Sequence, residues 1–268
     1  MPIARSAHVH PTAIIDPEAD LGEDVQVGPY VVVEGPVRIG SGCVIKAGAH
    51  LFGPLTMGEH NEVYSYAVLG EQPQHLKYEG EPTRLEIGDH NIFREHVTIH
   101  RGTTQSWVTR IGSHNFLMAN SHIAHDCKVG NHCIIANGSM VAGHCVLEDG
   151  VLLSGNATVH QFVRIGRLAL ISGLSGTGMD LPPFMICQRI NVTVGVNVVG
   201  MRRAGISNGS IDAVRKVFHL LYRSDMLLSH SVPRIEKELG HVSEVAELLA
   251  FIRASKRGIS LEHKREAA

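Results

Sequence analysis

The chain has 268 residues, of which 44% are hydrophobic, and its formal net charge is −2 at pH 7. This balance of charge argues against a nucleic-acid partner, and the absence of an apolar run of 18 residues argues against a membrane span. The chain starts without a basic and hydrophobic leader, and its five cysteines lack C-x-x-C spacing, which is typical of reduced thiols. We therefore expect a cytoplasmic protein.

A repeat of six residues runs through most of the chain. From Ile3 to Leu69 every sixth residue is aliphatic or Met, and the same phase resumes at Ile87 and continues to Ile171. Six residues are too few for a strand, a crossover helix and a return, so each hexad can supply only a short strand and a bend. Three hexads would make one triangular coil of a solenoid. Glycine often follows the inward residue, where we expect a corner with unusual backbone angles.

Two segments interrupt the repeat. Residues 71–86 replace the apolar series with Pro, Gly and charged residues, and residues 100–108 form a second break. Both are predicted to be loops that leave the solenoid. Loops on a rigid scaffold often carry function, although solenoids also tolerate surface insertions that have none.

A coil of 18 residues places position i beside position i+18, at about the strand spacing of 4.8 Å. His125 therefore lies next to Gly143, with Gln161 one coil further along. Acyl transfer needs a general base whose pKa is about 7 and an N–H donor that stabilises the developing oxyanion. His125 could be that base, Gly143 could supply the N–H, and Asp126 could hold the imidazole tautomer. The same edge of the solenoid gathers three further imidazoles, those of His122, His144 and His160.

A zinc hydratase is an alternative for this edge, because Cys127 and Cys145 lie one coil apart near the imidazoles. The hexapeptide-repeat carbonic anhydrases share an H-x4-H spacing that occurs nowhere in this chain, so we expect no metal. A catalytically silent scaffold is a further alternative.

Beyond residue 190 the repeat gives way to helical spacing, which divides the chain into a solenoid over residues 1–190 and a linker and helical domain over 191–268. Ser210 is predicted to cap a first helix. Pro233 is predicted in the first turn of a short helix that ends near Gly240. Ser243 is predicted to open a last helix that stops near Gly258.

Several motifs match one family far more specifically than the hexads do. They are Ser-His-Ile-Ala-His-Asp-Cys at 121–127, Val-His-Gln-Phe at 159–162, Gly-Glu-Pro-Thr-Arg at 80–84 and Val-Thr-Ile-His-Arg-Gly-Thr at 97–103. With these motifs the chain resembles, over nearly its whole length, the UDP-N-acetylglucosamine O-acyltransferases that open lipid A biosynthesis. The resemblance implies an all-β left-handed parallel β-helix with a C-terminal α-helical domain. It also implies a homotrimer with active sites between neighbouring subunits.

The resemblance implies transfer of an (R)-3-hydroxyacyl group from acyl carrier protein to the sugar 3-hydroxyl of a UDP-sugar. By the same resemblance His125 is the general base, Asp126 orients it and the Gly143 amide stabilises the oxyanion. No cofactor is implied beyond the phosphopantetheine on the carrier protein. Gly173 would leave room for a long acyl chain. The implied substrate-binding residues are Gln74, Lys77, His122, His144, His160 and Gln161, with Asn197 and Arg203 at the uridine diphosphate.

Three residues depart from the family pattern. His75 stands where Asp is common, Val199 where many members have Glu, and Ala204 where they have a second Arg. Some members that resemble this pattern around 197–205 use a 3-amino sugar nucleotide and form an amide, so an N-acyltransferase remains an alternative. Arg164 and Arg167 are candidates for a basic surface that receives the acidic carrier protein.

Overall fold

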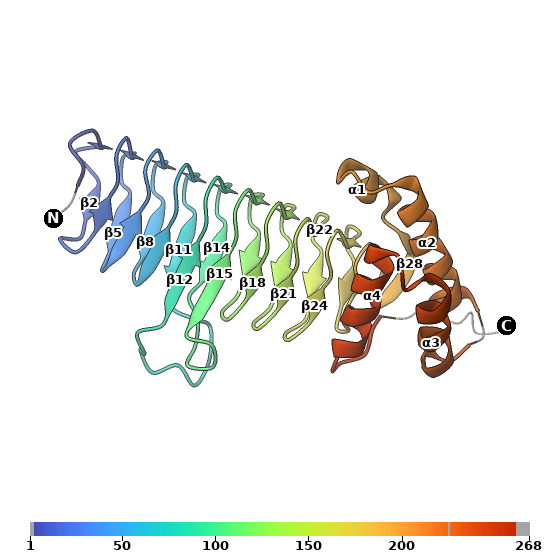
Figure 1. Ribbon diagram of the computed structural model, residues 1–268. Helices are drawn as coiled ribbons and strands as arrows, with labels where there is room; N and C mark the ends of the chain where they lie inside the picture. Colours follow the sequence, from blue (N-terminus) through green and yellow to red (C-terminus); the bar gives the residue numbers. More distant parts are fainter. Residues whose placement is uncertain (1–2, 225, 261–268) are drawn as a thin grey trace.

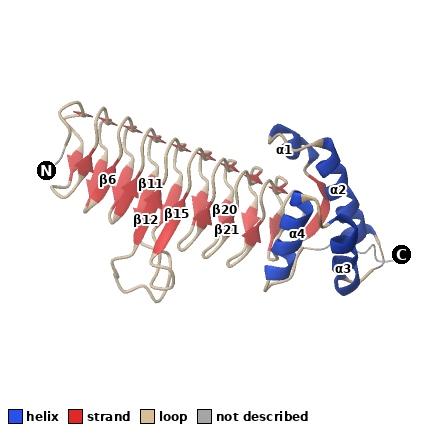
Figure 2. Ribbon diagram, in the orientation of Figure 1, coloured by secondary structure: helices blue, strands red, loops and turns tan. Residues whose placement is uncertain are grey.

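The computed structural model describes residues 3–224 and 226–260. It is a parallel β-solenoid whose coils stack along one axis, with the helices gathered at its C-terminal end (Figure 1). Figure 2 shows the short strands aligned in rows along the solenoid. The predicted parallel β-helix with a C-terminal helical domain is therefore confirmed.

Each hexad contributes a strand to one of three sheets that run the length of the solenoid. The first sheet contains, in order, β1 (His8–Val9), β4 (Gln26–Val27), β7 (Val44–Ile45), β10 (Glu62–Val63), β13 (Ile92–Phe93), β16 (Phe116–Leu117), β19 (Ile134–Ile135), β22 (Leu152–Leu153), β25 (Leu170–Ile171), β27 (Met185–Gln188) and β28 (Val192–Val196). The second contains β2 (Ile14–Ile15), β5 (Val32–Glu34), β8 (His50–Phe52), β11 (Val68–Glu71), β14 (Thr98–His100), β17 (His122–Ile123), β20 (Met140–Val141), β23 (Thr158–Val159) and β26 (Gly176–Thr177). The third contains β3 (Asp20–Leu21), β6 (Val37–Ile39), β9 (Leu55–Met57), β12 (Arg84–Ile87), β15 (Val108–Ile111), β18 (Lys128–Val129), β21 (Val146–Leu147) and β24 (Arg164–Ile165).

The inward residues of the repeat form the core. Every aliphatic, Met or Phe member of the series from Leu21 to Ile171 is buried, as are all five cysteines, which are unpaired. Strand partners are 18 residues apart where the coil is uninterrupted, as in the pairing of His122 with Met140. The two loops lengthen their coils, so that Glu62 pairs with Ile92. The register that brings distant side chains together is therefore the one expected from the repeat.

The glycines that follow inward residues have a different role from the one expected. Apart from Gly70 (φ 86°) none has positive φ, and a Cβ on Gly40 or Gly112 would lie 2.5 Å from the carbonyl oxygen of the next coil. Close stacking of coils, rather than an unusual backbone angle, requires glycine there. The left-handed angles fall three residues after the inward position, where His, Asn and Asp often stand, as at His90 (φ 56°) and Asp126 (φ 61°).

The helix boundaries agree with the predictions in part: one helix ends next to Gly240 and another begins at Ser243, as predicted, but other boundaries differ. They are α1 (Val198–Arg203), α2 (Asn208–Phe218), the π-helical turn η1 (His219–Arg223), α3 (Leu228–Leu239) and α4 (Ser243–Ala254). Ser207 caps α2, because its hydroxyl accepts from the backbone N–H of Ser210. Pro233 lies inside α3, which begins five residues earlier, and α4 ends four residues before Gly258. No helix in the described part of the chain is long and apolar enough to cross a membrane.

Candidate active site

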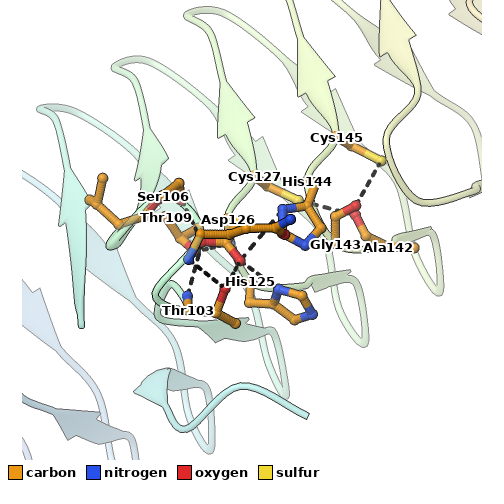
Figure 3. Close-up of polar contacts among 12 residues, drawn as sticks. Thr103, Ser106, Thr109, His125, Asp126, Cys127, Ala142, Gly143, His144 and Cys145 are labelled. Carbon is orange, nitrogen blue, oxygen red and sulfur yellow. Dashed lines mark hydrogen bonds and ion pairs between the residues drawn. The ribbon is translucent and has the colours of Figure 1, made fainter. Parts of the chain in front are cut away.

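A histidine and an aspartate meet at the corner between β17 and β18. His125 Nδ1 lies 2.8 Å from Asp126 Oδ2, and both residues are buried (Figure 3). Because Nδ1 faces the carboxylate, we assign the proton to Nδ1, which leaves Nε2 as the free acceptor of the ring. The corner therefore presents an imidazole whose orientation and tautomer are held by a buried carboxylate.

The loop between β14 and β15 supplies the partners of Asp126. Thr103 donates to the carboxylate through its backbone N–H at 2.9 Å and its hydroxyl at 2.6 Å, and Ser106 donates to Oδ1. The Asp126 backbone N–H donates to Thr109 Oγ1 at 2.8 Å. Burial acts to raise the pKa of Asp126, but the hydrogen bonds from His125, Ser106 and Thr103 outweigh it and lower that pKa. The carboxylate is thus ionised and fully bonded.

Gly143 lies directly beside the His125 ring, as the repeat predicts. A Cβ at this position would approach His125 Cε1 to 2.7 Å and Nε2 to 2.9 Å, so any larger residue would displace the ring. The Gly143 N–H donates to no residue that the structure describes. At the equivalent corner position of Asn131, by contrast, the N–H donates to Asp149 Oδ1. The site therefore combines a free imidazole nitrogen with a free backbone donor.

Two more imidazoles contact His125. The His144 ring lies edge-on, 4.9 Å between centroids, with its Nδ1 3.6 Å from Asp126 Oδ2, and its other face stacks on Phe162. The ring of His75 reaches in from the loop between β11 and β12, with its centroid 5.3 Å from that of His125. Burial lowers the pKa of His144 despite the nearby carboxylate of Asp126. Burial therefore favours the neutral form of His144.

A pair of histidines lies at the end of β14 and on β17. His122 Nδ1 lies 2.7 Å from Thr98 Oγ1, and the ring of His100 meets it edge-on at 4.8 Å between centroids. Burial lowers the pKa of His100 to about 4 and also lowers that of His122. The buried His100 Nδ1 has no hydrogen-bond partner among the described residues. Sequence reasoning missed His100, although it lies inside the 97–103 motif, because no repeat position marks it.

The two loops enclose a cavity of about 560 Å³ next to this corner. Gln74 and Lys77 both line it, as expected for substrate-binding residues. Arg101 anchors the first loop, because its Nε donates to the Tyr78 hydroxyl at 3.1 Å and its Nη1 donates to the Gly53 carbonyl at 2.8 Å. The remaining lining residues are His75, Leu76, Tyr78, Glu81, Thr103, Thr104 and Gln105.

The other predicted residues lie farther away. His160 and Gln161 are exposed two coils beyond His125, in register with Ala142 and Gly143. Gly173 lies beside Gly155, with room for a Cβ 3.4 Å from the Gly155 carbonyl oxygen.

Asn197 and Arg203 are not brought to this corner within one chain. Both belong to α1 or its cap, at the end of the solenoid opposite the N-terminus (Figure 1). Asn197 caps α1: its Oδ1 accepts from the Gly200 N–H, and its Nδ2 donates to the Leu168 carbonyl at 2.8 Å. Its side chain is therefore engaged in holding the helix.

The residues present do not fit a zinc site well. One ligand atom each from His125, Asp126 and His144 lies within 4.8 Å of the others. Both Asp126 oxygens, however, already accept hydrogen bonds, which leaves the carboxylate little capacity for a cation. The Cys127 and Cys145 thiols face the core and donate to backbone carbonyls, and burial raises the pKa of Cys127. They are therefore not available as ligands.

The two arginines expected to receive a carrier protein contact the helical domain. Arg167 forms a bidentate ion pair with Glu247 of α4 at 2.9 and 2.7 Å, and its guanidinium lies over the Phe184 ring. Arg164 lies over the ring of Phe251, also in α4. Both side chains therefore contact helical faces that are distant in sequence, while docking of a carrier protein stays a prediction.

Replacing Arg167 by Ala should therefore lower stability and leave binding of an acidic protein unchanged. Loss of a bidentate, partly buried ion pair and of the stacked guanidinium should lower the free energy of unfolding by about 1 to 2 kcal/mol. Urea denaturation measures this loss. Arg38→Ala is the control, because Arg38 pairs with Asp20 on the exposed face of β6. A variant that keeps its stability but binds carrier protein more weakly would contradict this prediction and support the docking interpretation.

Comparisons with known proteins agree with this geometry. A family model for bacterial transferase hexapeptide repeats matches residues 18–53 and 109–143, and one described as UDP-N-acetylglucosamine O-acyltransferase, domain 2, matches residues 180–260. Two relatives named acyl-[acyl-carrier-protein]–UDP-N-acetylglucosamine O-acyltransferase, from Halorhodospira halophila and an Anaeromyxobacter species, are 44% and 46% identical. Each match covers 94% of this chain and 98% or 99% of the relative.

A solved structure of UDP-N-acetylglucosamine O-acyltransferase from Moraxella catarrhalis gives a TM-score of 0.89 at 40% identity. The match covers 94% of this chain and 99% of that one. The repeat fold and its histidine corner therefore define a hexapeptide-repeat transferase. Within that class, the chain belongs to the UDP-N-acetylglucosamine O-acyltransferase family.

Proposed function

We propose that this chain transfers an (R)-3-hydroxyacyl group from acyl carrier protein to the 3-hydroxyl of UDP-N-acetylglucosamine, the first step of lipid A biosynthesis. The names of the relatives support the donor and the acceptor. The observation that carries the mechanism is the arrangement of Asp126, His125 and Gly143, in which a free imidazole nitrogen lies beside a free backbone N–H. We further propose that the enzyme works in the cytoplasm, a location that suits its five unpaired thiols.

In the proposed reaction, His125 Nε2 takes the proton of the sugar hydroxyl as its oxygen attacks the thioester carbonyl carbon. The Gly143 N–H then stabilises the oxyanion of the tetrahedral intermediate. When the intermediate collapses, the carbon–sulfur bond breaks, and the protonated His125 returns its proton to the pantetheine thiolate. Asp126 stabilises the imidazolium between these two transfers. One ester and one thiol are formed, with no net gain or loss of protons.

The remaining predicted residues are assigned to substrate positioning. Gln74 and Lys77 would contact the sugar from the cavity between the loops, together with His122 and His144. His160 and Gln161 would line the path of the pantetheine or sugar beyond the base. The open space at Gly173 supports room for a long acyl chain along the solenoid.

A homotrimer would complete this site. Asn197 and Arg203 lie too far along the solenoid to reach the ligand of their own His125, so their proposed contact with the uridine diphosphate requires a second copy of the chain. Met140 and Phe162 support such an interface, because they expose apolar side chains on the same stretch of solenoid.

A 3-amino acceptor is the second candidate, and one observation favours it. His75 places an additional imidazole against His125 at the position where the family commonly has Asp. An amine that arrives as an ammonium ion must lose one proton before it attacks and another as the amide forms. Two adjacent imidazoles could accept both protons, whereas a hydroxyl acceptor needs only one base.

A competition between the two acceptors tests the proposal. Purified protein is given a ladder of (R)-3-hydroxyacyl carrier proteins with equal amounts of UDP-N-acetylglucosamine and its 3-amino analogue, and products are identified by mass spectrometry. We expect the ester as the main product, from the longer acyl donors. Amide alone would replace the proposed acceptor by the amine, and no product from either acceptor would contradict the proposed enzyme activity.

A further inference from the structure

The chain returns to the solenoid after α4, next to a residue of the proposed substrate path. Ser255 Oγ donates to Asp180 Oδ2 at 2.7 Å, and the Asp180 N–H donates to the Gly258 carbonyl at 3.0 Å. Ile259 forms a parallel bridge with Asp180 and is buried. These contacts on both sides fix the backbone of Arg257 against the last coil.

Arg257 is held in place but is not neutralised. Its Nε donates to the Gly178 carbonyl at 3.0 Å, and its Nη2 lies 3.5 Å from His160 Nδ1. Within residues 3–224 and 226–260, no carboxylate lies at ion-pair distance from it, although the side chain is exposed. Of the five N–H donors of a guanidinium, three therefore remain for a ligand.

The register connects this arginine to the catalytic corner. Ile123, Val141, Val159 and Thr177 pair in sequence, which places Ala124, Ala142, His160 and Gly178 in one outward row. The row spans three coil spacings, or about 14 Å, from the neighbour of His125 to the residue that holds Arg257. Apart from His160, the row carries no large side chain, since its other members are two alanines and a glycine.

We propose that Arg257 and His160 form a phosphate subsite at the far end of this row. A guanidinium with a free edge beside an imidazole suits a phosphate ester, which it can bind through charge-assisted, bidentate hydrogen bonds. The inference rests on the proposed function, because both substrates then carry phosphate: the donor in its phosphopantetheine arm and the acceptor in its diphosphate. The distance from His125 requires an extended ligand with its reacting carbon at one end and its phosphate at the other.

The test compares Arg257→Gln with Lys256→Gln, which removes the same charge from the adjacent exposed residue. We expect Arg257→Gln to raise KM for one substrate by about tenfold or more, since hydrogen bonds to charged groups are the strong ones, with kcat changed less than twofold. Arg257→Lys should recover part of the loss, because it keeps the positive charge but cannot form the bidentate hydrogen bonds of a guanidinium. Lys256→Gln should behave as the wild type.

Two arms identify which phosphate is bound. The donor arm compares acyl-phosphopantetheine with acyl-pantetheine as acyl donors. If Arg257 binds the donor phosphate, the wild type should prefer the phosphorylated donor, and Arg257→Gln should lose that preference. In the acceptor arm, calorimetry measures the affinity for UDP-N-acetylglucosamine, and an acceptor subsite makes Arg257→Gln about tenfold weaker.

Calorimetry with 4′-phosphopantetheine and with UDP-N-acetylglucosamine needs no turnover. It therefore separates failure of the subsite from failure of the proposed reaction. Thermal denaturation identifies a variant that does not fold, in which case Arg257→Lys carries the comparison. Equal behaviour of the Arg257 and Lys256 variants in both arms would overturn the inference.

Discussion

Replacing His125 by Ala should lower kcat by about 10²- to 10⁴-fold, the usual contribution of a general base. The ring lies at a corner outside the hydrophobic core, so the melting temperature should change little. Removing it leaves the Gly143 N–H and the substrate contacts in place, and KM should therefore change less than kcat. Steady-state kinetics with acyl carrier protein and UDP-N-acetylglucosamine measure both constants.

A matched histidine provides the control. His60, His90, His114 and His132 form an exposed ladder of parallel imidazoles along another corner, with centroids 4.9 to 5.0 Å apart. His90→Ala removes one ring of this ladder without touching the proposed site and should keep wild-type kcat. If His125→Ala retained activity within a few-fold of wild type, His125 could not be the base.

Asp126→Asn should lower kcat by a similar factor, because the amide can no longer stabilise the imidazolium and can present its NH₂ group to His125 Nδ1 in place of an acceptor. The side chain is buried and accepts hydrogen bonds from Thr103 and Ser106 as well as from His125. The substitution places an amide donor against those donors, so stability should also fall, by about 1 to 3 kcal/mol. Kinetics and urea denaturation at pH 7 measure the two losses.

The sign of the pH dependence distinguishes this carboxylate from a surface one. Folding lowers the pKa of Asp126, so its ionised form stabilises the folded state above the ordinary carboxylate pKa of about 4. That contribution is lost as the pH falls through the lowered value. Between pH 7 and pH 3 the wild type should therefore lose more stability than Asp126→Asn. Asp212→Asn, at an exposed ion pair on α2, is the control and should follow the wild type. A parallel pH dependence of Asp126→Asn and wild type would contradict the assigned role of the carboxylate.

The three departures from the family pattern lie in two different places. His75 touches the His125 ring, so it bears on the chemistry of the acceptor. Val199 is exposed in α1, and Ala204 caps the C-terminal end of that helix. Neither reaches His125 within one chain, and their effect on the nucleotide depends on the proposed trimer. The acceptor competition therefore examines His75 most directly.

The sequence by itself determined the coil, the inward residues and the neighbourhood of His125 and Gly143. The reason is the constant period: when each coil contains 18 residues, a separation in sequence becomes a fixed distance of about 4.8 Å in space. The period also predicted the positions of the two loops, because the six-residue repeat of apolar residues is interrupted there. It carried no information on how those loops fold.

Only the tertiary structure decided what surrounds the corner. The loop after His100 supplies Thr103 and Ser106 to the Asp126 carboxylate, and the loop before Arg84 places His75 against His125. The structure also paired Arg167 with Glu247, 80 residues away. Contacts of this kind depend on irregular loops and on the docking of helices, for which no repeat relates position in sequence to position in space.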